Sequence, residues 1–114
     1  MAAHGVVFRG IVPNDKLISE LLISEFWLYP AIVNETFCTS ILEAKAAGCI
    51  PIVRLQGGMQ DVIGDGYFSI DNNDAIKNIL NSLDLDKIRE YNRIEALRYT
   101  WDARVLEWNK LLKI

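Results

Sequence analysis

Histidine and cysteine are scarce in this chain, and their scarcity excludes several kinds of chemistry. The 114 residues contain one histidine, His4, and two cysteines, Cys38 and Cys49. A single histidine beside the N-terminus argues against Ser-His-Asp or Cys-His catalysis, and no His/Cys cluster has the spacing of a zinc site. In a chain with enough apolar residues for a core, we expect the two cysteines to be free thiols rather than a disulfide.

An excess of positive charge and a long apolar run are also missing. The sequence has 12 Lys and Arg against 15 Asp and Glu, a net charge of −3. Without a basic excess, general nucleic-acid binding and an electrostatic membrane anchor are disfavoured. The N-terminus lacks the apolar core of a signal peptide, and no apolar run approaches the roughly 18 residues of a membrane span. We therefore expect a cytoplasmic protein with no transmembrane segment and no nucleic-acid partner.

The apolar residues that are present fall into short runs separated by segments with helical spacing. Hydrophobic residues make up 51% of the chain and charged residues 24%, as in an ordinary globular domain. Strands are predicted at Val6–Arg9, Phe26–Tyr29, Pro51–Val53 and Tyr67–Ile70. Strands that alternate with helices imply parallel pairing.

The predicted fold class is therefore α/β, with a Rossmann-like parallel sheet of about four strands, flanking helices and a C-terminal helical tail. We expect one partial domain over residues 1–114, with residues 1–5 outside the fold and helices over 84–114. Gly57-Gly58 is predicted to form a turn. Trp27, Trp101 and Trp108 read as anchors that pack in the core and between helices.

The stretch from Asn34 to Gly48 carries the pattern most suggestive of chemistry. Thr36 is an N-cap candidate for the helix that follows, and Gly48 is a C-cap candidate. If Thr36 caps this helix, the amides of residues 37–39 have no helical partner and, with the helix dipole, form an anion site suited to a pyrophosphate.

Two acids flank that helix start. Glu35 lies just before it, and Glu43 lies about two turns beyond it, roughly 10 Å along the axis at 1.5 Å per residue. Carboxylates accept hydrogen bonds from sugar and ribose hydroxyl groups. One acid on each side of an anion site therefore suits a sugar nucleotide, although a glutamate on a helix is also common as a plain solvated residue.

A longer set of segments resembles the C-terminal half of retaining glycosyltransferases of family 4, which have two facing Rossmann-like domains, the GT-B architecture. The segments are Val7–Gly10, Phe26–Pro30, Glu35–Phe37, Leu42–Val53, Gly57–Gly58 and Asp61–Ile63. Tyr99-Thr100-Trp101 resembles the family's terminal Phe-Ser-Trp segment. The likeness covers about Val6 to Leu112.

The resemblance implies a role for each matched residue. Glu35 matches the first acid of the family's Glu-x7-Glu motif, which sits by the donor sugar and stabilises positive charge, and Glu43 matches the acid that holds the ribose hydroxyls. The turn whose amides meet the diphosphate is matched by Thr36, Phe37, Cys38 and Thr39. Cys38 stands where the family commonly has glycine. The loop that contacts the nucleobase is matched by Gly10, Ile11 and Val12.

The resemblance also implies ligands and partners. The donor would be a UDP-, GDP- or ADP-sugar, with no further cofactor and no metal. The family's Gly-Arg and Lys cations and its acceptor-binding domain match nothing in this sequence. We therefore expect a glycosyltransferase fragment that is inactive alone and that needs the N-terminal half of the enzyme or a partner chain. An exposed sheet edge would favour self-association.

Two other interpretations remain open at this point. The chain could be a non-catalytic module, derived from such a domain, that binds a nucleotide or docks onto a partner. It could also be a different α/β protein, such as a response-regulator-like domain, although the clustered acids expected at the first strand ends are lacking. Turnover after addition of the complementary half would distinguish a split enzyme from the non-catalytic module. Metal-dependent phosphorylation would identify a response-regulator-like domain.

Overall fold

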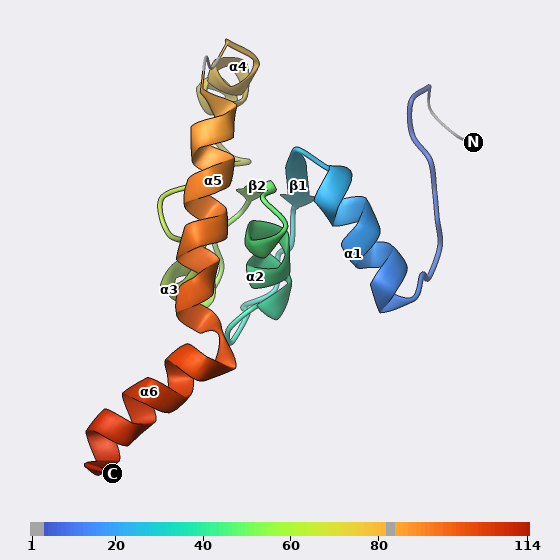
Figure 1. Cartoon of the computed structure of the whole chain (residues 1–114). Coiled ribbons are helices and arrows are strands. Elements are labelled where there is room, and N and C mark those ends of the chain that lie inside the picture. Colours follow the sequence, from blue (N-terminus) through green and yellow to red (C-terminus); the bar gives the residue numbers. More distant parts are fainter. Residues whose placement is uncertain (1–3, 82–83) are drawn as a thin grey trace.

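The structure, a computed structural model, describes residues 4–81 and 84–114, which form an α/β fold (Figure 1). Strands and helices alternate as far as the third strand, and helices follow to the C-terminus. The elements are α1 (Asn14–Ile23), β1 (Phe26–Tyr29), α2 (Thr39–Ala46), β2 (Ile50–Val53), α3 (Met59–Ile63), β3 (Phe68–Ser69), α4 (Asn73–Asn81), α5 (Leu85–Ala96), the 3₁₀-helix η1 (Leu97–Tyr99) and α6 (Trp101–Leu112). Residues 1–3 of the predicted segment 1–5 lie outside the described residues.

The three strands form one parallel sheet in the order β1-β2-β3. In the register of β1 and β2, Phe26 lies opposite Ile50 and Tyr29 opposite Val53. Parallel neighbours require a crossover, which α2 supplies between β1 and β2, and α3 supplies between β2 and β3. The predicted α/β class is confirmed as a partial Rossmann-like domain. All strands point the same way, so the loops that follow them gather at one edge.

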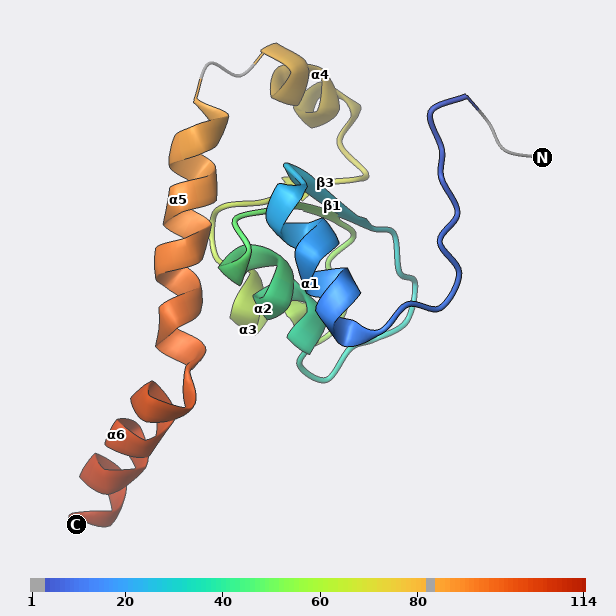
Figure 2. The same ribbon diagram turned by 45° about the vertical axis from the view of Figure 1, so that its right-hand side comes forward.

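The strand predicted at Val6–Arg9 is wrong. Within the described residues this run has no strand partner and is exposed, with Phe8 94% accessible. It extends along the outside of the molecule before α1 (Figure 2), and Arg9 pairs with Glu20 of α1 at 3.4 Å. Apolar composition gives a strand only where a neighbouring strand accepts its backbone hydrogen bonds. The described sheet consequently has three strands rather than about four.

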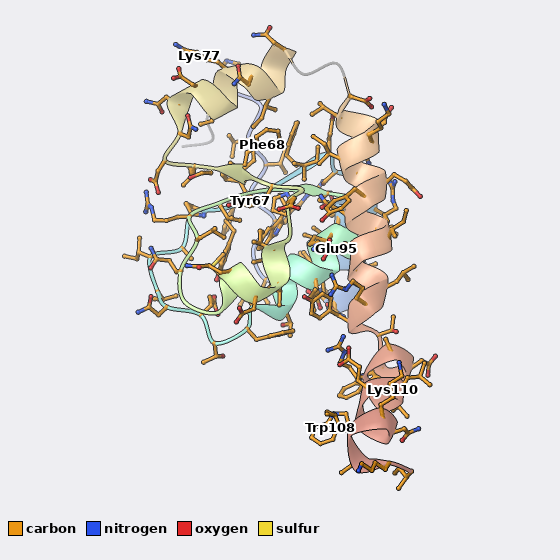
Figure 3. The ribbon with its side chains drawn as sticks, turned by 90° about the vertical axis from the view of Figure 1, so that its left-hand side faces the viewer. Tyr67, Phe68, Lys77, Glu95, Trp108 and Lys110 are labelled. Carbon is orange, nitrogen blue, oxygen red and sulfur yellow. The ribbon has the colours of Figure 1, made fainter. Side chains whose placement is uncertain are left out.

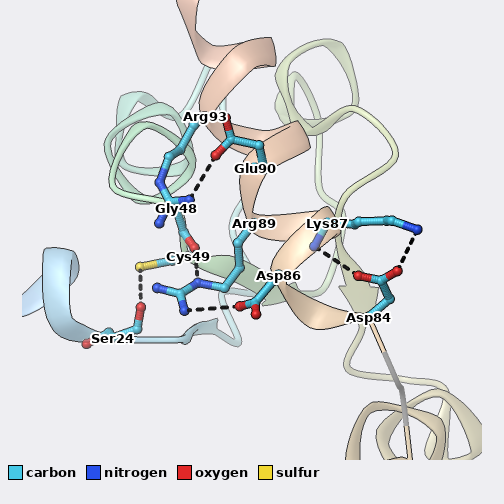
Figure 4. Close-up of polar contacts among 9 residues, drawn as sticks. All are labelled: Ser24, Gly48, Cys49, Asp84, Asp86, Lys87, Arg89, Glu90 and Arg93. Atoms are coloured by element: carbon cyan, nitrogen blue, oxygen red, sulfur yellow. Dashed lines mark hydrogen bonds and ion pairs between the residues drawn. The ribbon is translucent and has the colours of Figure 1, made fainter.

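The end of α2 confirms the glycine prediction. The amide of Gly48 donates to the carbonyl of Lys45 at 2.9 Å, and the amide of Cys49 donates to the carbonyl of Ala44 at 2.9 Å. With Gly48 at φ +82°, these bonds form a Schellman motif. Helix α5 packs at this point, where the Nε of Arg89 donates to the Gly48 carbonyl at 2.8 Å (Figure 4).

The main core lies between α2, β2 and α3. Its buried members are Cys38, Ile41, Val53, Met59, Val62 and Ile63. Asn92 of α5 is also fully buried, and its Nδ2 donates to the carbonyls of Cys49 at 3.0 Å and Gly66 at 2.9 Å. This side chain replaces hydrogen bonds that two buried carbonyls would otherwise make with water. It therefore fastens α5 to the residues that lead into β2 and β3.

A lysine is enclosed beside this core. Lys45 of α2 is fully buried, and its Nζ donates to the carbonyl of Val62 at 3.0 Å. Burial lowers the pKa of its ammonium group, and the nearby Glu95 carboxylate acts in the opposite direction. Figure 3 shows Glu95 on the side of α5 that faces the sheet and α2. A hydrogen bond with Tyr91 is the largest cause that lowers the pKa of Glu95.

The last helix begins as predicted but packs differently. Thr100 caps α6, because its Oγ1 accepts a hydrogen bond from the amide of Ala103 at 3.3 Å. The expectation that Trp101 and Trp108 are packing anchors is wrong, since they are 86% and 60% exposed. Helix α6 extends away from the sheet (Figures 1 and 3) and buries none of its residues. Trp27 is half-buried, as expected, and packs against the core. Of the helices in the described residues, none has both the length and the apolar character needed to cross a membrane.

Candidate functional site

The candidate site lies where β1 and β2 end. The chain leaves β1 after Tyr29 and reaches Glu35 in the following loop, while the loop after β2 reaches Gly57 and Gly58. Glu35 and Gly57 form an isolated parallel bridge, so the two loops lie side by side. The carboxyl edge of a parallel sheet is the usual ligand-binding edge in open α/β folds.

The Glu35 side chain is held by the last residue of β1. The Tyr29 hydroxyl donates to Oε1 of Glu35 at 2.6 Å. This hydrogen bond is the largest cause that raises the pKa of the Tyr29 phenol, and burial adds to it. The Tyr29 ring stacks on Trp27 at a centroid distance of 4.9 Å. The carboxylate is therefore attached to a strand rather than free in a loop.

The Glu35 backbone is held by the glycine pair. The Gly58 amide donates to the Glu35 carbonyl at 2.6 Å. A Cβ on Gly57 would be 2.4 Å from that carbonyl oxygen, and a Cβ on Gly58 would be 2.0 Å from the Thr36 oxygen. Only glycine permits such an approach of two backbones. The turn predicted at Gly57-Gly58 is also the support of Glu35.

The start of α2 differs from the prediction that Thr36 caps it. The helix begins at Thr39, and its N-cap is Cys38, which has φ +65°. Thr36 is exposed in the loop. The reason is packing, because the chain turns through a left-handed residue that places the Cys38 side chain in the core beside Ile41. The free amides of the first helical turn therefore begin at Thr39 rather than at Phe37.

The other predicted residues lie in separate surroundings. Phe37 is half exposed and meets Tyr99 edge to face at 6.1 Å. Glu43 is exposed on α2 and borders a groove against α1, with Ile18, Leu21, Leu22, Ala46 and Ala47. The two acids of the Glu-x7-Glu pair thus have different neighbours. Glu35 contacts Tyr29 of β1 and the loop of Gly57 and Gly58, whereas Glu43 borders the groove against α1.

The predicted nucleobase loop lies apart from Glu35. Gly10, Ile11 and Val12 belong to the extended segment before α1, and Gly10 and Val12 border a cavity there with Val7, Arg9, Lys16, Leu17 and Glu20. Ile11 is fully exposed. The contacts described for this segment are with α1. A role for these three residues in base binding stays a prediction.

Sequence reasoning missed two features of this edge. It assigned no role to Tyr29, although a tyrosine closing a strand six residues before the glutamate was visible. It also missed the cavity of about 490 Å³ between the start of α2 and α6, which is lined by Phe37, Thr39, Leu42, Tyr99, Trp101, Arg104 and Trp108. That cavity joins residues far apart in the sequence, so only the fold reveals it.

A charged pair also stands at this edge. Arg54 follows β2 and binds the Asp71 carboxylate through Nε at 3.0 Å and Nη2 at 2.7 Å. This hydrogen bonding lowers the pKa of Asp71. Over residues 4–81 and 84–114, no group of three or more His, Cys, Asp or Glu side chains is placed to hold a metal ion.

Comparison with known families gives one clear result. The family described as glycosyl transferases, group 1, matches residues 1–98. The chain therefore belongs to the group 1 glycosyltransferases, whose general chemistry is glycosyl transfer. No curated protein was found that matches the sequence.

Proposed function

We propose that this chain is the part of a retaining glycosyltransferase that binds the donor, a nucleoside diphosphate sugar. The complete enzyme would move a hexose from that donor to an acceptor hydroxyl group. The single observation that carries the proposal is the fixation of Glu35 at the carboxyl edge of the sheet. Its side chain bonds to Tyr29, and its backbone bonds to Gly58 at 2.6 Å. A carboxylate held in this way is preorganised to meet a ligand.

Each predicted residue has a role in this proposal. Glu35 lies by the donor sugar and stabilises the positive charge that develops as the diphosphate leaves. The diphosphate meets the loop of Thr36, Phe37 and Cys38 and the amides that open α2 at Thr39. Glu43 accepts hydrogen bonds from the ribose. Gly10, Ile11 and Val12 contact the base, which requires their segment to approach the Glu35 edge when the donor binds.

The proposal includes a reducing, cytoplasmic location. Cys38 and Cys49 are both buried free thiols. Burial is the largest cause that raises the pKa of each thiol, which keeps both in the less reactive protonated form. Unpaired buried thiols suit a compartment in which disulfides do not form.

An amide-resolved NMR titration with UDP, GDP and ADP, and with their sugar conjugates, tests the donor site. We expect a dissociation constant on the order of 0.1–1 mM, about −4 to −5.5 kcal/mol, for the preferred nucleotide. Saturable shifts should cluster at residues 10–12 and 36–43. An absence of shifts at millimolar ligand would contradict a donor site in this chain.

A second candidate function is a module that docks onto a partner without turnover. The observation that favours it is the exposed apolar surface of α6 and the C-terminal end, where Trp101, Leu111 and Ile114 are 86%, 75% and 84% accessible. Mixing this chain with an acceptor-binding half of a group 1 enzyme separates the two candidates. Glycosyl transfer in the mixture supports the enzyme, and binding without transfer supports the docking module.

A further inference from the structure

We propose that Tyr29 is the positioning residue of Glu35, and that its hydroxyl group sets the carboxylate orientation that recognises the sugar of the donor. This inference rests on the proposed donor-binding function. It assigns sugar recognition, as distinct from nucleotide recognition, to one hydrogen bond. Tyr29 itself makes no contact with the donor in this proposal.

The first argument is the contrast in rigidity between the two residues. Tyr29 is the last residue of β1 and is paired in register with the buried Val53. Its ring is fixed further by the stack on Trp27. Glu35 is a loop residue with three rotatable side-chain bonds, and ordering it costs conformational entropy. The hydrogen bond of 2.6 Å transfers the order of the strand to the carboxylate.

The second argument is the use of the donor and acceptor groups. A tyrosine hydroxyl has one proton to donate, and Tyr29 gives it to Oε1 of Glu35. That bond leaves Oε2 outside the pair, at a fixed angle, to accept from a sugar hydroxyl. The pKa of Tyr29 is raised by the same hydrogen bond, so the phenol stays protonated at neutral pH. It therefore serves as a donor and not as a base.

The third argument is that the backbone and the side chain of Glu35 are held independently. Gly57 and Gly58 fix the main chain of Glu35 and Thr36 through contacts that involve no side chain of Tyr29. Removal of the Tyr29 hydroxyl should therefore free the carboxylate without moving the loop. The sugar-binding group is disturbed, and the diphosphate-binding backbone is not.

The test compares Tyr29→Phe with the unsubstituted protein. The substitution removes the hydroxyl and keeps the ring that stacks on Trp27. Dissociation constants are measured for the preferred nucleoside diphosphate and for its sugar conjugate. We expect the constant for the sugar conjugate to rise about tenfold and that for the nucleoside diphosphate to change less than about twofold, as for loss of one hydrogen bond to a charged group.

The matched control is Tyr67→Phe. Tyr67 is also half-buried and packs against the core, so the control removes a hydroxyl elsewhere. It should leave both dissociation constants unchanged. A purely structural role of Tyr29 would lower the melting temperature or weaken both ligands alike. Equal constants for Tyr29→Phe and the unsubstituted protein would likewise overturn the proposal.

A ligand-free measurement keeps this proposal separate from the proposed function. Three-bond NMR couplings report whether the Glu35 side chain occupies one rotamer or several. We expect one rotamer in the unsubstituted protein and averaged couplings in Tyr29→Phe. Averaged couplings in both would overturn the positioning role, whatever the ligands do. One rotamer that is lost in Tyr29→Phe, with no binding of any nucleotide, would uphold the hydrogen bond and contradict the donor site.

Discussion

The guanidinium group of Arg93 lies against Gly48, so close that a Cβ on the glycine would be 2.4 Å from it. Gly48 is the residue that ends α2, and Arg93 belongs to α5. The glycine thus has two reasons to lack a side chain, its positive φ and the helix that crosses it. Gly48 therefore ends α2 and also leaves the space in which Arg93 of α5 packs.

Replacing this glycine should measure both effects. We expect Gly48→Ala to lower the free energy of unfolding by about 1–2 kcal/mol from the left-handed backbone alone. Displacement of Arg93 should add to this loss. Denaturant unfolding gives the value. The control is Gly5→Ala, since Gly5 has the same φ of +82° and, beyond its two chain neighbours, no atom of the described residues lies within 4 Å of a Cβ placed there. A loss at Gly48 no larger than at Gly5 would contradict the interpretation.

Asn92 provides a test of the core, because its side-chain amide donates hydrogen bonds to two carbonyl groups. We expect Asn92→Asp to lower the free energy of unfolding by about 3–5 kcal/mol at pH 7, because a buried carboxylate would face the carbonyls of Cys49 and Gly66. Burial raises the folded pKa of the introduced carboxyl group above its unfolded value of about 3.9. The loss should therefore shrink as the pH falls through that folded pKa. The exposed change Asn78→Asp should have little effect at any pH.

Lys45 predicts a dependence of stability on alkaline pH. Burial lowers its folded pKa below the unfolded value of 10.5, so between the two values the unfolded chain binds more protons. The free energy of unfolding should rise with pH across this window. Lys45→Met keeps the length of the side chain and removes its titration. The free energy of unfolding of the variant should therefore lack this rise. An identical pH dependence in the two proteins would refute a buried ammonium group.

Glu43 tests the ribose role. We expect Glu43→Ala to weaken binding of the nucleoside diphosphate by about 1–3 kcal/mol, the range for a hydrogen bond to a charged group. Titration calorimetry or NMR gives the constants. Glu25→Ala removes another exposed glutamate and should have no effect. An unchanged affinity in a folded Glu43→Ala protein would remove Glu43 from the site.

The sequence predicted the features that depend on neighbours in the chain. The run Phe26–Tyr29 forms a strand, Gly48 ends α2, and Thr100 caps α6. Each follows from backbone preference or from a hydrogen bond across three or four residues. The spacing of Glu35 and Glu43 around the predicted helix start indicated these two acids, and the family resemblance strengthened that interpretation.

The predictions that were wrong concern features set by contacts between residues far apart in the sequence. Val6–Arg9 has strand composition, but no strand pairs with it in the part of the chain that the structure describes. Thr36 is a good cap by residue type, yet burial of Cys38 moves the helix start to Thr39. The bond between Tyr29 and Glu35 depends on how a strand end and a loop approach each other in space. Sequence spacing contains no such information.

The position of helix α6 outside the core affects how easily it unfolds on its own. It contributes no residue to the core, so its unfolding exposes little apolar surface that is not already exposed. Its amide protons should exchange with deuterium far sooner than those of α2, whose residues Ile41 and Ala44 are fully buried. Helix α6 and the sheet should therefore unfold at very different rates. A protease that cuts after Arg104 would remove most of α6 while the sheet stays folded.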